Sequence, residues 1–250
     1  MNTQTILFAL AGALCTTLTP AAQAETLDYT PVKINQTTSA AFPQSLVTVG
    51  IRSGVASIAV AVDEKGMMTD YLVTAYSHPA FAESAVAALR KWTFGPMMIH
   101  GAPSSSKTDL TFNFEVDGVV VVSMTALDSP ELIWFKIAPN SLAYRACTPA
   151  QLSRAPSATK VVRPNYPADL ARSSRGGRVF VDFYIDEQGH VRMPSVSREA
   201  YETNGVLASI AVSTLSQWEF EPPVANGRNV LVRAQQAFDF KPGEPEAPRL

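Results

Sequence analysis

The sequence predicts an α+β protein made of two tandem ββαβ domains, each a small antiparallel three-stranded sheet covered on one face by a helix. Three observations predict this fold class. The same landmarks occur twice in the same order, apolar residues alternate along the expected strands, and each copy holds one apolar helical stripe. Neither a helix nor a sheet can bury its apolar side alone, so we expect the two to pack together.

The repeated landmarks set the spacing of the two copies. Gly54 and Gly177 are 123 residues apart, and Trp92 and Trp218 are 126 apart, so small loop insertions separate otherwise equal units. The sequence predicts the following organisation: a signal peptide over 1–24, a flexible lead-in over 25–41, a first domain over 42–125, a connecting segment and linker over 126–164, a second domain over 165–242 and a C-terminal tail over 243–250.

The first 24 residues are typical of an export signal. The apolar run from Ile6 to Leu18 is shorter than the ~20 residues that a membrane span needs. Ala22-Gln23-Ala24 then supplies the small-x-small pattern of a cleavage site. We predict a cleaved signal peptide, with an uncleaved inner-membrane anchor as the alternative.

The first copy alternates polar and apolar residues before and after a helical segment. Asp63-Glu64-Lys65-Gly66 predicts a tight turn between the first two strands, with Gly66 in the left-handed conformation. Pro79 suits the first turn of a helix. The expected elements are a strand with Ala56, Ile58, Val60 and Val62 on one face, a return strand over 67–74, a helix with Phe81, Ala85, Leu89 and Trp92 on one face, a third strand over 110–116 and, after the hairpin signal Asp117-Gly118, a fourth over 119–123.

The second copy repeats the pattern more clearly. Pro194 removes an amide donor from its return strand, which predicts an edge position or a bulge there. The expected apolar rows are Val179, Val181, Phe183 and Ile185 on the first strand, Leu207, Ile210, Ala211, Leu215 and Trp218 on the helix, and Val230, Val232, Ala234, Phe238 and Phe240 on the last strand.

Composition and residue spacing point away from several function classes. A net charge of −2 and a pI of about 5.9 predict no nucleic-acid partner. The histidines His78, His100 and His190 do not stand at metal-ligand spacing, so we predict no metal site and no cofactor. The turn residues Asp63 and Asp186 are explained by bonds to their own backbone, and no nucleophile motif is present, so we predict no enzymatic activity.

Two features of the linker region bear on partners. Once the signal peptide is removed, Cys147 is the single thiol, which we interpret as a small buried apolar residue, with an intermolecular disulfide and a homodimer as the alternative. Between Arg145 and Arg178 basic residues outnumber acidic ones. Arg163, Arg172, Arg175 and Arg178 are candidates for a basic docking patch on acidic material, against the alternative of a solvated linker.

The ordered landmarks resemble the TonB C-terminal domain family. The resemblance covers most of the chain after residue 41, and it is carried in the second copy by Tyr166-Pro167, Gly177, Val179, Val181, Phe183, Ile185-Asp186, Gly189, Trp218, Phe220, Pro222, Gly227 and Phe238. The first copy departs from the family pattern, with Phe42 in place of Tyr and Ala56 in place of Val.

The resemblance implies a periplasmic, non-catalytic module of transport across the outer membrane. In this family the last strand of the sheet binds an extended peptide of a TonB-dependent receptor by strand addition. Carried over to this sequence, the peptide-binding edge is Val230, Leu231, Val232, Arg233, Ala234 and Gln235. The expected partners are TonB-dependent outer-membrane receptors or other envelope proteins.

The chain also departs from a complete energy transducer of that family. The 18 prolines are dispersed rather than gathered in a long spacer, and the N-terminal apolar run is predicted to be cleaved. A binding module therefore fits better than a direct transmitter of the proton-motive force. The alternative is an envelope or cell-wall attachment protein that uses the same fold and the basic stretch.

Overall fold

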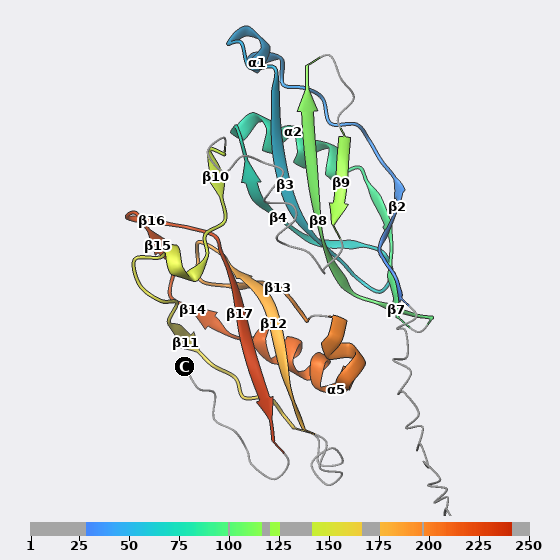
Figure 1. Cartoon of the computed structure of the whole chain (residues 1–250), viewed down its shortest axis with the longest axis vertical. Coiled ribbons are helices and arrows are strands. Elements are labelled where there is room, and N and C mark those ends of the chain that lie inside the picture. Colours follow the sequence, from blue (N-terminus) through green and yellow to red (C-terminus); the bar gives the residue numbers. More distant parts are fainter. Residues whose placement is uncertain are drawn as a thin grey trace, which may run out of the picture.

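The computed structural model describes residues 29–99, 101–116, 121–125, 142–166, 176–196 and 198–241. Two copies of a strand–strand–helix–strand unit follow one another along the chain, and Figure 1 shows the first copy above the second. The predicted α+β fold class is confirmed. The predicted signal peptide, the hairpin turn at Asp117-Gly118, His100, Arg172, Arg175 and the tail from 243 lie outside the described residues.

The first copy is built on one long antiparallel sheet. Its order is β10-β4-β3-β8-β9, so β3 is central and the helix α2 covers one face. The elements up to this sheet's last strand are β1 (Tyr29–Thr30), β2 (Lys33–Gln36), α1 (Gln44–Thr48), β3 (Ser53–Val62), β4 (Met68–Tyr76), α2 (Pro79–Leu89), β5 (Thr93–Gly95), β6 (Met97–Ile99), β7 (Ala102–Ser104), β8 (Ser106–Glu115) and β9 (Val121–Thr125).

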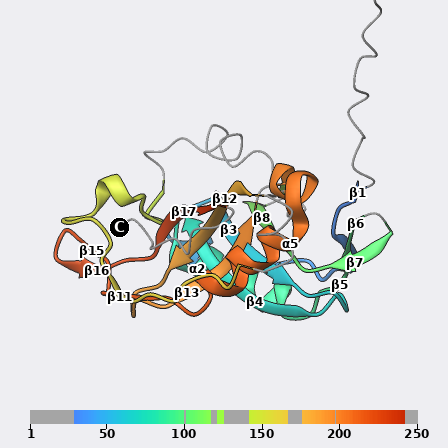
Figure 2. The same ribbon diagram turned by 90° about the horizontal axis from the view of Figure 1, so that it is seen from below.

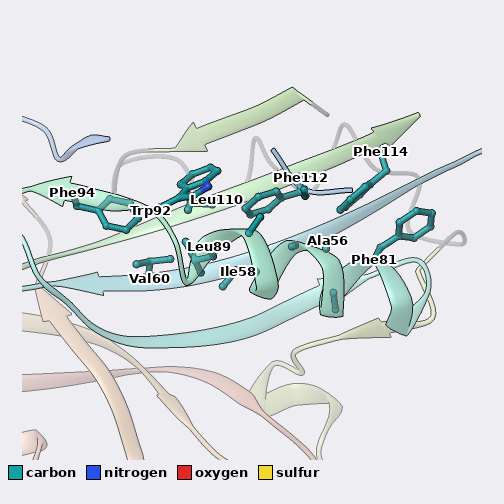
Figure 3. Close-up of a cluster of buried hydrophobic side chains, with 14 of the residues drawn as sticks. Ala56, Ile58, Val60, Phe81, Leu89, Trp92, Phe94, Leu110, Phe112 and Phe114 are labelled. Atoms are coloured by element: carbon teal, nitrogen blue, oxygen red, sulfur yellow. The ribbon is translucent and has the colours of Figure 1, made fainter. Parts of the chain in front are cut away.

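The core of the first copy lies between this sheet and α2. Figure 3 shows Phe81 and Leu89 of the helix region facing the side chains of β3 and β8, with Trp92 closing one end. The predicted inward row of β3 is confirmed, since Ala56, Ile58, Val60 and Val62 are all buried. The N-terminus of α2 is also as predicted, with Pro79 in its first turn, and the His78 side chain accepts a hydrogen bond from the Ala80 amide.

The second copy has a three-stranded sheet of order β13-β12-β17, with α5 on one face. Its buried residues include Val181, Ile185, Leu207, Leu215 and Trp218, as the two apolar rows predict. The other described elements are β10 (Tyr144–Arg145), the 3₁₀ helix η2 (Pro149–Gln151), β11 (Ala158–Lys160), β12 (Gly177–Ile185), β13 (Val191–Val196), α5 (Arg198–Leu215), β14 (Glu219–Phe220), β15 (Val224–Ala225), β16 (Arg228–Asn229) and β17 (Val232–Phe240).

The segments before each copy are more ordered than the sequence predicts. Residues 29–41 were expected to be a flexible lead-in, yet β2 pairs with β5, and the Trp92 indole donates to the Thr38 carbonyl at 2.8 Å. The predicted linker repeats this arrangement, because β11 pairs with β14 and the Trp218 indole donates to the Val162 carbonyl at 2.8 Å. The duplicated unit therefore begins before its Phe-Pro or Tyr-Pro landmark.

Each copy carries one small additional sheet, and the two small sheets lie on opposite sides of the molecule. The β1–β6–β7 sheet stands at one side and the β15–β16 hairpin at the other in Figure 2. No helix in the described part of the chain is long and apolar enough to cross a membrane.

The two sheets contact each other through the faces that the helices leave open. Ala59 of β3, Tyr184 of β12, Met193 of β13 and Leu231 form one buried cluster. A second contact joins the two copies beside this cluster. The Arg192 guanidinium of the second copy donates to the Asp70 carboxylate of the first, with a Nε–Oδ2 distance of 2.9 Å. A cavity of about 280 Å³ remains beside this cluster, between Asp70, Lys107 and Pro194. The copies are therefore packed on each other rather than strung on a linker.

The return strand of the second copy has both features that Pro194 predicts. The strand β13 lies at an edge of its sheet, and its pairing with β12 shifts register between Asp182 and Tyr184. Met193 takes a positive φ of 49° at this irregularity. The bulge turns the Met193 side chain into the cluster between the copies, where it is 7% exposed.

Candidate strand-binding edge

The strand β17 is an edge strand, and its first residues already have a hydrogen-bonded neighbour. The Cys147 amide donates to the Leu231 carbonyl at 2.8 Å, and the Arg233 amide donates to the Cys147 carbonyl at 2.9 Å. Cys147 thus forms a one-residue parallel bridge beside Val232. The outward carbonyl of Leu231 and the outward amide of Arg233 are therefore occupied within the chain.

The alternation of a β-strand determines which later groups face outward. The backbone amides and carbonyls of Leu231 and Arg233 point away from β12, and by alternation those of Gln235 and Ala237 do so as well. The backbone groups of Val232, Ala234 and Gln236 point toward β12. No described strand pairs with the outward side of β17 at Gln235 or Ala237. The carbonyl of Ala237 accepts a hydrogen bond from the Gln236 side-chain amide at 2.8 Å, which an incoming strand would replace. An exposed edge of this kind can pair with another chain.

The equivalent edge of the first copy is closed. The strand β8, which corresponds to β17, pairs with β9 along Asp109–Asn113, with Thr111 opposite Ser123 and Phe112 opposite Val122. The repeat spacing of 126 residues places Thr111 at the position of Ala237, and Figure 1 shows β9 (light green) beside β8. The predicted fourth strand is confirmed at 121–125, and it occupies in the first copy the site that the second copy leaves open.

Most of the six residues predicted as the peptide-binding edge are already bonded or buried within the chain. Val230 precedes β17 and donates its amide to the Pro223 carbonyl, and Leu231 is buried between the copies. Val232 and Ala234 face the helix side, and Arg233 is bonded to Cys147. Of the six residues, only Gln235 has both an exposed side chain and an outward backbone, and its side chain donates to Asp182 at 3.2 Å.

Sequence reasoning missed Phe180 and Ala237, which flank the open edge. Phe180 is 43% exposed on the outer face of β12 and is the register partner of Ala237. The signal was present in the sequence. Phe180 occupies an outward position of an alternating strand, where a polar residue is expected.

One residue of the predicted basic patch, Arg178, is paired with an acidic residue of the second copy, and so are two basic residues outside the patch, Lys160 and Arg154. Arg178 forms a two-bond ion pair with Asp239, with distances of 2.5 and 2.9 Å. Lys160 pairs with Glu219 at 2.8 Å, and Arg154 pairs with Glu221. Of the three other patch residues, Arg172 and Arg175 are outside the described residues, and Arg163 is exposed. Surface pairs of this kind reduce the field that an acidic polymer would meet.

The remaining candidate groups have structural roles. Asp63 Oδ1 accepts from the amides of Lys65 and Met67, and Asp186 Oδ1 accepts from those of Gln188 and His190, as predicted for turn residues. Cys147 is half-buried against the second core, and burial raises the pKa of its thiol. Among the described residues, no group of three His, Cys, Asp or Glu side chains could hold a metal ion.

Comparison with known proteins adds one finding to this geometry. A family model described as Gram-negative bacterial TonB protein C-terminal matches residues 39–116 and 162–242. The two matches cover one copy each and together more than half of the chain. A search of the curated proteins finds no match.

Proposed function

Because the chain belongs to the family of the Gram-negative bacterial TonB protein C-terminal domain, a non-catalytic protein-interaction family, we propose that it is a TonB-like binding module in transport across the outer membrane. It recognises an extended peptide of a TonB-dependent receptor by adding that peptide as a strand to β17. It acts in the periplasm after its signal peptide is cleaved. The open edge of β17 around Gln235 and Ala237 supports this most directly.

The difference between the two copies supports the same proposal. The first copy fills its equivalent edge with β9, so among the described residues this edge is open in the second copy and closed in the first. Main-chain hydrogen bonds provide the affinity in strand addition, and side-chain contacts on either face of the sheet provide the specificity. The first copy serves as a fixed support through the cluster of Ala59, Tyr184, Met193 and Leu231.

A proline at Ala237 tests the proposal. Ala237→Pro removes one outward amide, which an edge strand tolerates, whereas a proline at Val232 would break pairing with β12. We expect the exported chain to recover TonB-dependent receptors from solubilised envelopes, and the Ala237→Pro variant to recover at least tenfold less. Ala237→Ser is the control, since it keeps the amide. Circular dichroism and thermal unfolding verify that each variant folds.

The pull-down also distinguishes the alternative role in envelope attachment. Full receptor recovery by a folded Ala237→Pro variant would contradict strand addition at this edge. Recovery of cell-wall fragments that 0.5 M salt releases, with no receptor, would favour attachment through the basic stretch, because exposed charges are screened at about 4–5 Å at that ionic strength.

A further inference from the structure

The outer face of the second sheet has an uncovered apolar residue beside the open edge. Phe180 lies next to Ala237 across one β12–β17 register pair, and Ala237 is itself exposed. Ala237 has a side chain of one carbon, so it does not shield the Phe180 ring from a residue on the far side of β17. Neighbouring strands lie about 4.8 Å apart, so a strand added beyond β17 would lie about 10 Å from β12, a gap that the Phe180 ring and a long side chain together can span over Ala237.

In the first copy the corresponding outer-face residues lie on three paired strands, because β9 occupies the edge that is open in the second copy. There Ser57 stands at the position of Phe180, Thr111 at that of Ala237, and Ser123 of β9 completes the row. The Ser57 and Thr111 hydroxyls are 3.2 Å apart and share a hydrogen bond. In the first copy the polar residues Ser57 and Thr111 thus have a small polar residue, Ser123, beside them on the edge strand β9.

The helix-facing row beside it has phenylalanine at the edge-strand position in both copies. Phe112 pairs with Val122 of β9, and Phe238 occupies the position equivalent to Phe112. Both phenylalanines are buried. The two edges therefore share one requirement, an apolar residue over the helix side, and differ on the outer face.

We infer that the peptide bound at β17 carries a large apolar side chain at the residue that pairs with Ala237, and that this side chain covers Phe180. The inference rests on the proposed strand addition and adds to it the residue that selects the peptide. Covering an exposed aromatic ring stabilises the complex in proportion to the apolar area removed from water. A serine at that peptide position would leave the ring exposed.

The test uses two synthetic peptides derived from the strand that the first copy already binds. One carries residues 119–127 of this chain between lysine pairs, and the other is identical except for leucine in place of Ser123. Titration calorimetry of each against the full chain without its signal peptide gives two dissociation constants. We expect the leucine peptide to bind about tenfold more tightly, which corresponds to about 1.4 kcal/mol.

Two variants separate this inference from the proposed function. Phe180→Ser copies the residue of the first copy and is expected to reduce the preference for leucine to within about twofold, while binding of the serine peptide remains. Ala237→Pro is expected to abolish binding of both peptides. A preference for leucine that survives Phe180→Ser would overturn the inference but leave strand addition intact.

Failure of both peptides to bind the unaltered chain would overturn the inference as well. Sedimentation measurements then identify the other occupant of this edge. A dimer of the chain that dissociates in the Phe180→Ser and Ala237→Pro variants would show that a second copy pairs along β17.

Discussion

Replacing Gly189 with alanine is expected to lower the free energy of unfolding by about 3 kcal/mol or more. Gly189 has a φ of 91°, and an added Cβ would lie 2.0 Å from the Phe220 carbonyl oxygen. The backbones of the two residues are held close together by a hydrogen bond, since the Phe220 amide donates to the Gly189 carbonyl at 2.8 Å. The methyl group would therefore force the turn and β14 apart. Urea unfolding followed by tryptophan fluorescence measures the change.

Gly227→Ala is the matched control for this variant. Gly227 also has a positive φ, of 73°, but an added Cβ would meet no atom within 4 Å. We expect a cost of about 1 kcal/mol, that of the left-handed backbone alone. Equal losses from the two variants would show that the close approach to Phe220 is not what requires glycine.

Removing Asp109 is expected to lower the free energy of unfolding by about 3 kcal/mol, because it leaves the Lys107 ammonium buried without its main carboxylate. Lys107 is 6% exposed and lies over the Tyr184 ring, 5.2 Å from its centroid. Burial lowers the pKa of Lys107, the charge of Asp109 raises it, Arg233 lowers it and Asp182 raises it. The Asp109→Leu variant, compared with the parent chain by urea unfolding, measures the effect.

The double variant Lys107→Met/Asp109→Leu is expected to recover stability to within about 1 kcal/mol of the parent chain, since apolar side chains then replace two buried groups whose charges interact. The exposed pair supplies the control, and Lys160→Met should leave stability unchanged within error. If the double variant were as unstable as Asp109→Leu alone, the pairing of these two charges would not account for the loss.

The pH dependence of the Asp109→Leu variant has a definite sign. Burial places the pKa of Lys107 in the folded chain below its ordinary value of 10.5, so the unfolded chain binds more protons between these two values. The stability of the variant relative to the Lys107→Met/Asp109→Leu chain should therefore rise as pH increases through that interval. A fall over the same interval would contradict a lowered pKa of Lys107 in the folded chain.

The order of elements could be predicted because the duplication repeats residues whose roles are local. Asp186 and Gly189 define a turn through their own backbone, and Trp218 ends an apolar helix face. Because each of these residues recurs at a nearly constant spacing in the other copy, a motif that is weak evidence by itself is supported by its second occurrence. The contact between Gly189 and Phe220 gives a physical reason why the turn and the Trp-x-Phe motif occur together.

The packing of one copy on the other was not predicted, although its signal is present in β3. Its outward residues Ser57, Ala59 and Ala61 are small, and Ala59 is fully buried, so both faces of the strand are covered. The alternation along β3 predicts one buried face, because an antiparallel sheet commonly has its other face in contact with water. Nor does any local pattern show that Cys147 bridges to Val232, since the two residues are 85 positions apart.

The bonds of residues 143–147 suggest how the molecule would carry force. The Ala143 and Ala146 backbones bond to β4 of the first copy, and Cys147 bonds to β17 of the second. A pull along β17 would therefore be passed directly into the first sheet through main-chain bonds. We expect the pair of copies to resist tension as one mechanical unit, and single-molecule extension would show this as a single rupture rather than two.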